Sequence, residues 1–430
     1  MHTGLRLLAG ANRWRATAGV RSLACDRWHR RRVASARRSE RNVSTERERQ
    51  CLILFRSSGL LLGWHRSSFA ASRLGVKLPR RSLKETAMMI DMHAHWRPAA
   101  VADALRARTR EPRILRNEAG IEVLKAARMG DEPLATAFDN VDFHLGRMDR
   151  QDVGVSVLSL LGSFCWIESQ PLDVSGPLCR SVNDGLSAIC AEHPGRFAAY
   201  AALPLIDIAA AAAELERVLA LPGMIGAQIP GNAFLTRADA EAMRPLLEVA
   251  NRHHAVLFIH HGPRPGDAFP KVAGDTDNAR RRNGTLDMQA SLSSVMVTLS
   301  LTDYLAPYPD VMIHVHNLGG NIPYEVERMD HRCLLDTPQE ELPSSRFRKA
   351  KVYVDCNSFG PRAIEAAVSL YGADRIVCGT DGTEFGVDWT RKALAEAQIG
   401  EDAREQILHR NAAAMLARVA ATAPRERTAA

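Results

Sequence analysis

Residues Ile90-Asp91-Met92-His93-Ala94-His95 decide the fold, because an apolar run leads directly into two histidines spaced one residue apart. In a β-strand, residues i and i+2 project from the same face. His93 and His95 are therefore expected to point together from the end of a buried strand. Paired imidazoles there suit a divalent metal. The spacing alone also fits a chance pair or a histidine packed in the core.

Seven further short apolar runs follow along the chain, rich in Val, Ile, Leu and Ala and mostly without polar alternation. Such runs are typical of strands buried on both faces. The eight expected strands are 88–92, 155–161, 197–203, 225–229, 255–259, 311–315, 351–355 and 375–379. Helix-like segments lie between them, at 177–193, 207–220, 238–253, 291–305, 322–335 and 362–371.

This alternation predicts an α/β fold, a TIM (β/α)8 barrel over residues 88–421. A doubly wound open sheet is less favoured, because no glycine-rich phosphate loop follows the first strand. Nearly 60 residues separate His95 from the second expected strand, with a possible hairpin near 121–124. A connection of that length usually has a function, such as a lid or pocket wall. Residues 393–418 are expected to be helices that close the barrel, and residues 422–430 to fray.

Residues 1–87 differ from the rest, with 18 arginines and 2 lysines against 5 acidic residues. We expect this extension to be disordered. It has the composition of a transit-type presequence or of a basic tail for an anionic partner. It also fits upstream sequence read from a misplaced start, since Met88 and Met89 directly precede the first strand. The last interpretation is favoured.

The net charge of +7 comes from this extension, because residues 88–430 carry a net charge of −8. The alkaline balance is therefore not evidence of nucleic-acid binding. No run approaches the roughly 18 uninterrupted apolar residues of a membrane span. The eight cysteines form no CxxC pair, and Cys356 and Cys378 lie in apolar runs. They are expected to be free buried thiols of a cytoplasmic protein.

The polar residues that follow the other strands test the first motif, because a TIM barrel has its active site where its strands end. The fifth expected strand leads into His260-His261, the sixth into His316 and the eighth into Asp381. Singly, each has an ordinary structural explanation: a packed core histidine, a helix cap and a turn residue. Together with His93 and His95 they predict a metal site.

Several motifs resemble the amidohydrolase superfamily, in the family 2 branch typified by 2-amino-3-carboxymuconate-6-semialdehyde decarboxylase. The resemblance spans about residues 89–415 and includes Met148-Asp-Arg-Gln-Asp-Val-Gly-Val and His193-Pro-Gly-Arg-Phe. The motifs at the strand ends are Met89-Ile-Asp-Met-His-Ala-His, Leu257-Phe-Ile-His, His316-Asn-Leu-Gly-Gly-Asn-Ile-Pro and Gly379-Thr-Asp-Gly-Thr-Glu-Phe.

The resemblance implies that His93, His95, His260 and Asp381 are the metal ligands and that His316 is a catalytic acid/base. His261 stands where the branch commonly has proline, so His261 is the alternative to His260. The fourth strand ends in Gln228-Ile229-Pro230 and lacks the carboxylated lysine of binuclear relatives. One divalent metal is therefore expected, with zinc as the first candidate and Mn²⁺ or Fe²⁺ as alternatives.

Three imidazoles and a carboxylate leave an open position for water or a substrate oxygen. The resemblance ranks non-oxidative decarboxylation of a carboxylated aromatic or muconate-type compound first, with His316 and Asp381 as catalytic groups. Hydrolysis or hydration of a lactone, amide or ring-cleavage product is the alternative. A metal-dependent nuclease and a non-enzymatic binding protein with a basic tail are less favoured.

The substrate is expected to be small and anionic, since arginines lie near the strand ends. Arg97, Arg264 and the run 280–282 are candidate anchors, because guanidinium groups bind carboxylates in bidentate fashion. Phe164 and Trp166 are candidate walls for a flat ring. Each is also explained as an ordinary surface or packing residue. The resemblance further implies a homodimer; no nucleic-acid or membrane partner is expected.

Overall fold

The computed structural model describes residues 88–125, 132–133, 140–160, 167–267 and 282–422. The predicted disorder of residues 1–87 lies outside these ranges, as does nearly all of the segment 422–430, and both stay predictions. Within the described ranges, no helix combines the length and the apolar character that crossing a membrane requires.

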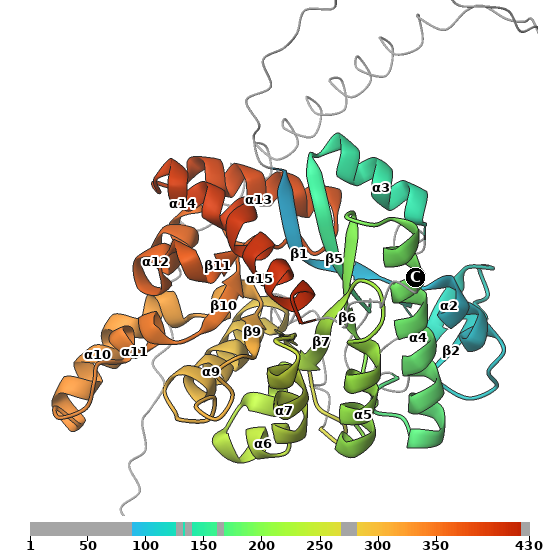
Figure 1. Ribbon diagram of the computed structural model, residues 1–430, viewed down its shortest axis with the longest axis horizontal. Helices are drawn as coiled ribbons and strands as arrows, with labels where there is room; N and C mark the ends of the chain where they lie inside the picture. Colours follow the sequence, from blue (N-terminus) through green and yellow to red (C-terminus); the bar gives the residue numbers. More distant parts are fainter. Residues whose placement is uncertain (1–87, 126–131, 134–139, 161–166, 268–281, 423–430) are drawn as a thin grey trace, which may run out of the picture. The chain divides into compact units, whose positions relative to one another are not determined.

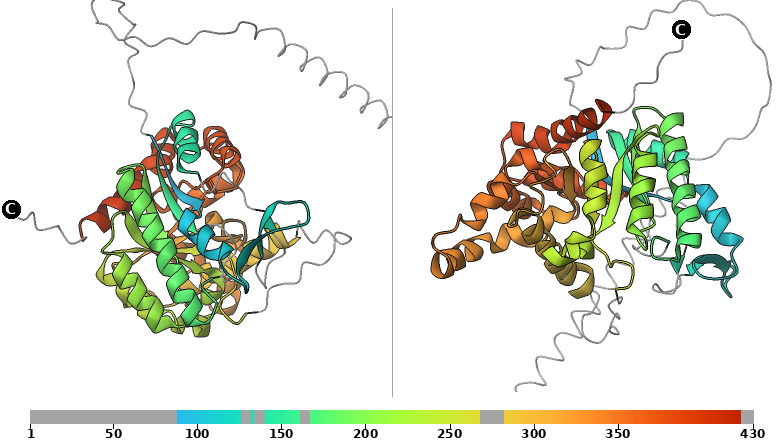
Figure 2. Two further views of the ribbon diagram at one scale, coloured as in Figure 1. Left: turned by 90° about the vertical axis from the view of Figure 1, so that its right-hand side faces the viewer. Right: turned by 60° about the horizontal axis from the view of Figure 1, so that its bottom comes forward.

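Eight parallel strands form a nearly closed barrel, which confirms the TIM-barrel prediction (Figures 1 and 2). Neighbours in the sheet are consecutive barrel strands along the chain, as βαβ connections produce. In sheet order the strands are β1 (Met89–Trp96), β5 (Val153–Leu160), β6 (Phe197–Ala201), β7 (Met224–Pro230), β8 (Val256–His260), β9 (Met312–Val315), β10 (Val352–Asp355) and β11 (Ile376–Val377).

Two main-chain hydrogen bonds join the first strand to the last segment of the barrel. The N–H of Met92 donates to the carbonyl of Cys378 (2.9 Å), and the N–H of Thr380 donates to the carbonyl of His93 (3.4 Å). They bring the beginning of the domain next to its end.

Helices surround the barrel, with caps that the sequence supplies. Asp207 accepts the N–H of Ala210 at the start of α5, and Thr236 and Asp239 form a capping box on α6. The main helices after β5 are α4 (Leu172–Glu192), α5 (Ile208–Val218), α6 (Arg237–Glu241), α7 (Arg244–Arg252), α9 (Met288–Ser300), α10 (Ile322–Asp336), α11 (Pro343–Lys349), α12 (Pro361–Tyr371), α13 (Glu384–Glu396), α14 (Glu401–Glu405) and α15 (Asn411–Ala420).

The core has two parts, one between the strands and the helices and one inside the barrel. Met92, Tyr200 and Phe258 belong to the inner part, and so do Ala412 and Met415 of α15. Figure 1 shows α15 lying across the barrel. Apolar side chains therefore fill one end of the barrel, and the prediction that C-terminal helices close it is confirmed.

The long connection after β1 contains a small antiparallel sheet, which confirms the predicted hairpin. Its strands are β2 (Arg113–Arg116), β3 (Glu122–Lys125) and β4 (Glu132–Pro133). Helix α2 (Ala99–Arg106) precedes this sheet and α3 (Val141–Arg150) follows it. Parts of the connection lie outside the described residues, so its function as a lid or pocket wall stays a prediction.

Several predicted boundaries are wrong. Strand β1 continues to Trp96, so His93 and His95 lie inside the strand. The helix predicted at 238–253 is two helices, because Pro245 at the start of α7 lacks the N–H that would continue a helix from α6. Helix α4 begins at Leu172 and includes Pro177, which was expected to start it.

Candidate metal centre

A β-bulge in β1 sets the direction of the two histidines. The register between β1 and β5 shifts between Asp91 and Ala94, and Oδ1 of Asp91 accepts the N–H of His93 (3.1 Å). Bulges turn side chains to new directions next to active sites. His93 lies within this bulge and His95 lies just after it, and the centroids of their rings are 5.2 Å apart.

Asp91 also accepts a hydrogen bond from the hydroxyl of Thr380, the residue before Asp381. Burial raises the pKa of Asp91 to about 6, although the hydrogen bond from Thr380 opposes this shift. Asp381 itself has φ = 61°, a left-handed conformation that aspartate tolerates better than most residues. The carboxylates of Asp91 and Asp381 thus belong to one hydrogen-bonded corner between β1 and β11.

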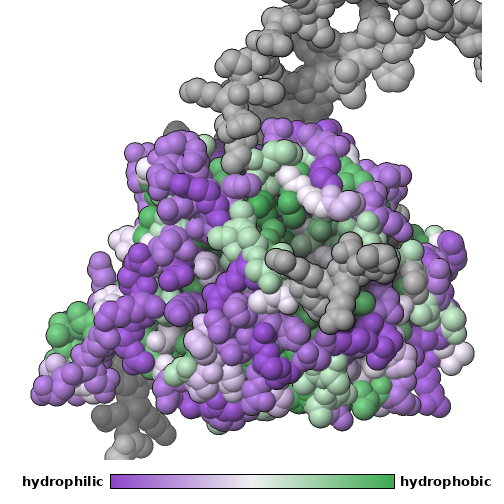
Figure 3. Space-filling model, in the orientation of Figure 1, coloured by the Kyte–Doolittle hydropathy of each residue, from purple (hydrophilic) through white to green (hydrophobic). Residues whose placement is uncertain are grey.

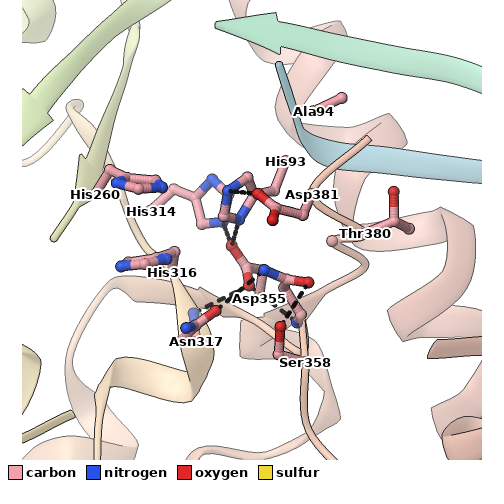
Figure 4. Close-up of polar contacts among 12 residues, drawn as sticks. His93, Ala94, His260, His314, His316, Asn317, Asp355, Ser358, Thr380 and Asp381 are labelled. Carbon is pink, nitrogen blue, oxygen red and sulfur yellow. Dashed lines mark hydrogen bonds and ion pairs between the residues drawn. The ribbon is translucent and has the colours of Figure 1, made fainter. Parts of the chain in front are cut away.

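The structure brings together all five residues predicted for the metal centre. Figure 4 shows four of them, with His93 between Asp381 and the pair His260 and His316. Its ring centroid is 5.2 Å from that of His260 and 5.4 Å from that of His316. Two sets of three residues have potential ligand atoms within 4.8 Å of one another: His93, His95 and Asp381, and His93, His260 and His316.

Hydrogen bonds determine which ring nitrogen of each candidate histidine can bind a metal. A carboxylate or carbonyl oxygen can only accept a hydrogen bond, so the ring nitrogen that contacts it must carry a proton. His93 Nδ1 contacts Asp355 Oδ2 (3.1 Å), and His260 Nδ1 contacts the carbonyl of His261 (3.0 Å). His95 Nδ1 contacts Ser159 Oγ (2.9 Å), whose own proton goes to the carbonyl of Ala94. In its neutral form each of the three rings therefore carries its proton on Nδ1 and offers the lone pair of Nε2, as a metal requires.

One of these Nε2 atoms is exceptional. Among the described residues, Nε2 of His93 is buried and has no hydrogen-bond partner, and it lies 3.4 Å from Asp381 Oδ1. His95 Nε2 lies 3.1 Å from the same oxygen. Buried polar atoms normally have partners. Imidazole nitrogens and a carboxylate oxygen at this spacing fit a divalent metal in the chemistry of their donor set.

Asp355, at the end of β10, was missed as a site residue. It is fully buried, and its Oδ2 accepts from both His93 and His314, the latter at 3.0 Å. Its Oδ1 accepts the main-chain N–H groups of Asn317 and Asn357, each at 3.0 Å. The sequence contains a sign of this role, because Asp355 is a carboxylate at the end of an expected strand, as Asp381 is close to the end of another.

A second layer lies behind Asp355. His314 Nε2 donates to Asp355, so the lone pair on Nδ1 accepts from the hydroxyl of Tyr200 (3.3 Å). Both His314 and Tyr200 are buried inside the barrel. The result is a directed chain of hydrogen bonds from Tyr200 through His314 to Asp355, and His93 donates to the same carboxylate.

The charge states of the histidines differ. Burial lowers the pKa of His260 and of His316 well below the usual range, so both rings are neutral. Burial also opposes a charge on His93, but Asp355 and Asp381 outweigh it and raise its pKa to about 10. A metal at Nε2 of His93 would replace the proton held there.

The structure gives less support to the candidate substrate-binding residues than to the candidate metal ligands. Arg97 is buried and directly follows β1, two residues after His95. The guanidinium of Arg264 is paired with Asp239 (2.8 Å) and Asp267 (3.3 Å). Arg282 is exposed at the start of a π-helical turn. Phe164, Trp166, Arg280 and Arg281 lie outside the described residues.

Gln228 lies near the end of β7, the strand in which the carboxylated lysine of binuclear relatives was looked for and is absent. It pairs in register with Phe258, and its neighbours Ala227 and Ile229 pack on the outer side of the barrel. Its side chain therefore faces the inside of the barrel, and its Oε1 is buried with no hydrogen-bond partner among the residues that the structure describes.

The fold and the site define a class: a (β/α)8-barrel enzyme with a histidine-rich candidate metal centre at the carboxyl ends of its strands. Residues 90–418 match the amidohydrolase family, and the chain belongs to that family. The resemblance seen in the sequence motifs is thereby confirmed.

Relatives within the family are decarboxylases. The chain is 25% identical over 297 residues to the gamma-resorcylate decarboxylase of Rhizobium sp. (strain MTP-10005), covering 62% of this chain and 86% of that enzyme. It is 23% identical over 248 residues to the 2-amino-3-carboxymuconate-6-semialdehyde decarboxylase of Dictyostelium discoideum, covering 56% and 66%.

Among solved structures, a dihydroxybenzoic acid decarboxylase from Polaromonas sp. JS666 was determined with bound manganese and the inhibitor 2-nitroresorcinol. It superposes with a TM-score of 0.53 at 20% identity, covering 77% of this chain and 97% of that one. This likeness supports the assignment of the fold.

Proposed function

We propose that this protein is a metal-dependent non-oxidative decarboxylase of a carboxylated aromatic or muconate-type compound. One observation carries the proposal: three histidines that keep Nε2 lone pairs converge with an aspartate where the barrel strands end. The names of the family relatives give the reaction class, since they decarboxylate resorcylate and a carboxymuconate semialdehyde.

His93, His95, His260 and Asp381 are the proposed ligands of one divalent metal. When bound, such an ion supplies a Lewis acid that polarises substrate oxygens. Zinc is the first candidate because its usual ligands are imidazole and carboxylate. Mn²⁺ and Fe²⁺ are the alternatives, and the manganese bound in the Polaromonas structure supports Mn²⁺.

The reaction breaks the bond between the carboxyl carbon and the adjoining carbon and releases CO2. The electron pair remains on the adjoining carbon, which must gain one proton. His316 and Asp381 are the proposed groups for that proton transfer, since His316 lies beside His93 and Asp381 is itself a proposed ligand. Arg97 is the proposed carboxylate anchor, supported by its burial at the end of β1, two residues after His95. Arg264 and Trp166 remain weaker candidates for substrate binding.

A screen of carboxylated aromatics and muconate-type acids in D2O tests the proposal. We expect CO2 release together with a product that carries one deuterium at the carbon that lost the carboxylate. A product that has gained the elements of water without CO2 release would instead establish the hydrolase or hydratase alternative.

We also propose a cytoplasmic homodimer. Figure 3 shows an apolar group at the far end of α10. Leu334 and Leu335 are exposed in the last turn of this helix. The five cysteines of the described residues are all free and buried, which supports a reducing compartment. Light scattering of the purified protein tests the dimer, and a monomeric mass would reject it.

A further inference from the structure

The main chain of His261 contacts two histidines of the site at once. Its N–H donates to Nε2 of His316 (2.9 Å), and its carbonyl accepts from Nδ1 of His260 (3.0 Å). The three rings are nearly parallel: His316 stacks on His260 with centroids 4.2 Å apart, and on His261 with centroids 5.2 Å apart.

The first of these hydrogen bonds determines the tautomer of His316. A main-chain N–H only donates, so Nε2 of His316 must offer a lone pair, and the proton of the neutral ring must be on Nδ1. Within the part of the chain that the structure describes, Nδ1 of His316 is buried and has no hydrogen-bond partner. A buried N–H without a partner is unfavourable until a ligand accepts from it.

We propose that the main-chain N–H of His261 is a positioning group, which holds His316 as the Nδ1–H tautomer so that the ring donates a hydrogen bond to an oxygen of the bound substrate. The ring's part in the reaction rests on the proposed function, whereas its tautomer does not. The bound substrate must therefore present a carboxylate or phenol oxygen that can accept a hydrogen bond from Nδ1–H of His316.

The same contact restricts what His316 does during the reaction. A second proton on Nε2 would oppose the N–H of His261, so protonation of the ring requires this hydrogen bond to break. While the hydrogen bond is intact, His316 polarises a substrate oxygen, and its part in the proposed proton transfer begins only when this hydrogen bond is released.

Two substitutions at position 261 separate the main-chain N–H from the side chain. His261→Pro removes both the imidazole and the N–H, because proline has no main-chain donor. His261→Ala removes the imidazole and keeps the donor. His260 precedes this position in an extended strand, the conformation that a following proline prefers.

The test is ¹⁵N NMR of the full chain with labelled histidines, loaded with zinc, and with His316→Gln to assign the His316 signals. We expect His316 to carry its proton on Nδ1 in the wild type and in His261→Ala, and to lose this preference in His261→Pro. A proton on Nε2 of His316 in the wild type would overturn the inference, and this result requires no variant at position 261.

The kinetic test compares kcat of the two variants, with zinc content and melting temperature measured on each. We expect His261→Pro to lose about 10-fold or more in kcat beyond the loss in His261→Ala, as for other hydrogen-bond partners of active-site histidines. Equal kcat values in two folded, zinc-loaded variants would reject the positioning role. If the tautomer is as stated but no carboxylated compound is turned over, the proposed function fails and the tautomer assignment stands.

Discussion

The carboxylate of Asp91 in β1 is hydrogen-bonded to the hydroxyl of Thr380, 289 residues later in the chain. Each residue is next to a proposed ligand: Asp91 accepts the N–H of His93, and Thr380 precedes Asp381. The Thr380 hydroxyl also accepts the N–H of Gly382 (3.2 Å). This buried contact therefore helps to set the position of His93 relative to that of Asp381, together with the main-chain hydrogen bond from Thr380 to His93.

Replacing this hydroxyl is expected to weaken metal binding. Thr380→Val keeps the shape of the side chain but removes the donor to Asp91 and the acceptor for Gly382. We expect the affinity for zinc to fall about 10-fold, measured by competition with a chromogenic chelator.

Thr298→Val is the matched control, because Thr298 is also buried and its hydroxyl donates to the carbonyl of Leu235 away from the metal centre. Thr298→Val should reduce stability without changing zinc affinity. If both valine variants bind zinc like the wild type, the Asp91–Thr380 contact does not position the ligands.

Asp355→Asn is expected to damage the site more severely. The amide keeps one accepting oxygen but places an NH2 group against ring N–H groups or main-chain N–H groups that now donate to a carboxylate. We expect zinc affinity to fall about 10- to 100-fold, with a lower melting temperature in the metal-free protein. Wild-type affinity in Asp355→Asn would show that this hydrogen bond does not orient His93.

Metal content separates the proposed ligands from the proposed catalytic group. His95→Ala and Asp381→Ala should each lower the bound metal well below the one ion per chain expected of the wild type, since each removes a donor atom. His316→Gln should keep the metal and lose turnover. Elemental analysis of the purified variants measures the first effect and initial rates measure the second. A metal-free wild-type protein would contradict the proposed mechanism.

Acid should destabilise the fold through His144, which lies on α3 away from the metal centre. Burial, and then the charge of Arg147, lower the pKa of His144 to about 3. In the unfolded chain His144 binds a proton as the pH falls through about 6.5, whereas in the folded chain it stays neutral until about pH 3. The free energy of unfolding is therefore highest above pH 6.5 and decreases as the pH falls below it. Between pH 7 and pH 5 the loss is about 2 kcal/mol.

Urea unfolding across this pH range measures the effect. His144→Gln keeps an oxygen that can accept from Arg147, which now donates to His144 Nε2 at 2.9 Å. Its free energy of unfolding should change less with pH than that of the wild type, because other titrating groups are common to both proteins. Identical pH dependence in the two would show that His144 does not govern this loss.

The barrel was predictable because its strands are buried on both faces and so appear as apolar runs in the sequence. The convergence of the candidate ligands was predictable because His93, His260 and Asp381 follow those runs within two residues. The bulge after Asp91 was not predictable, since it is a shift in the register between β1 and β5, which exists only once the two strands pair.

The roles of Asp355 and His261 were hidden for related reasons. Asp355 reaches His93 from another strand, across 262 residues of sequence. His261 acts through its main chain, and a main-chain N–H is the same in every residue except proline. Residue types indicate which side chains can bind a metal, whereas their hydrogen-bonded partners depend on tertiary contacts.

The hydrogen bonds between Met92 and Cys378, and between Thr380 and His93, have a consequence for how the protein is made. A ribosome releases β1 long before β11, so the two parts of the proposed metal centre cannot meet until almost the whole domain has been synthesised. A metal held by His93 and Asp381 would then bind late in folding and would hold the first and last strands of the barrel together. Removing it should loosen first the seam between β1 and β11, where hydrogen exchange would detect the opening.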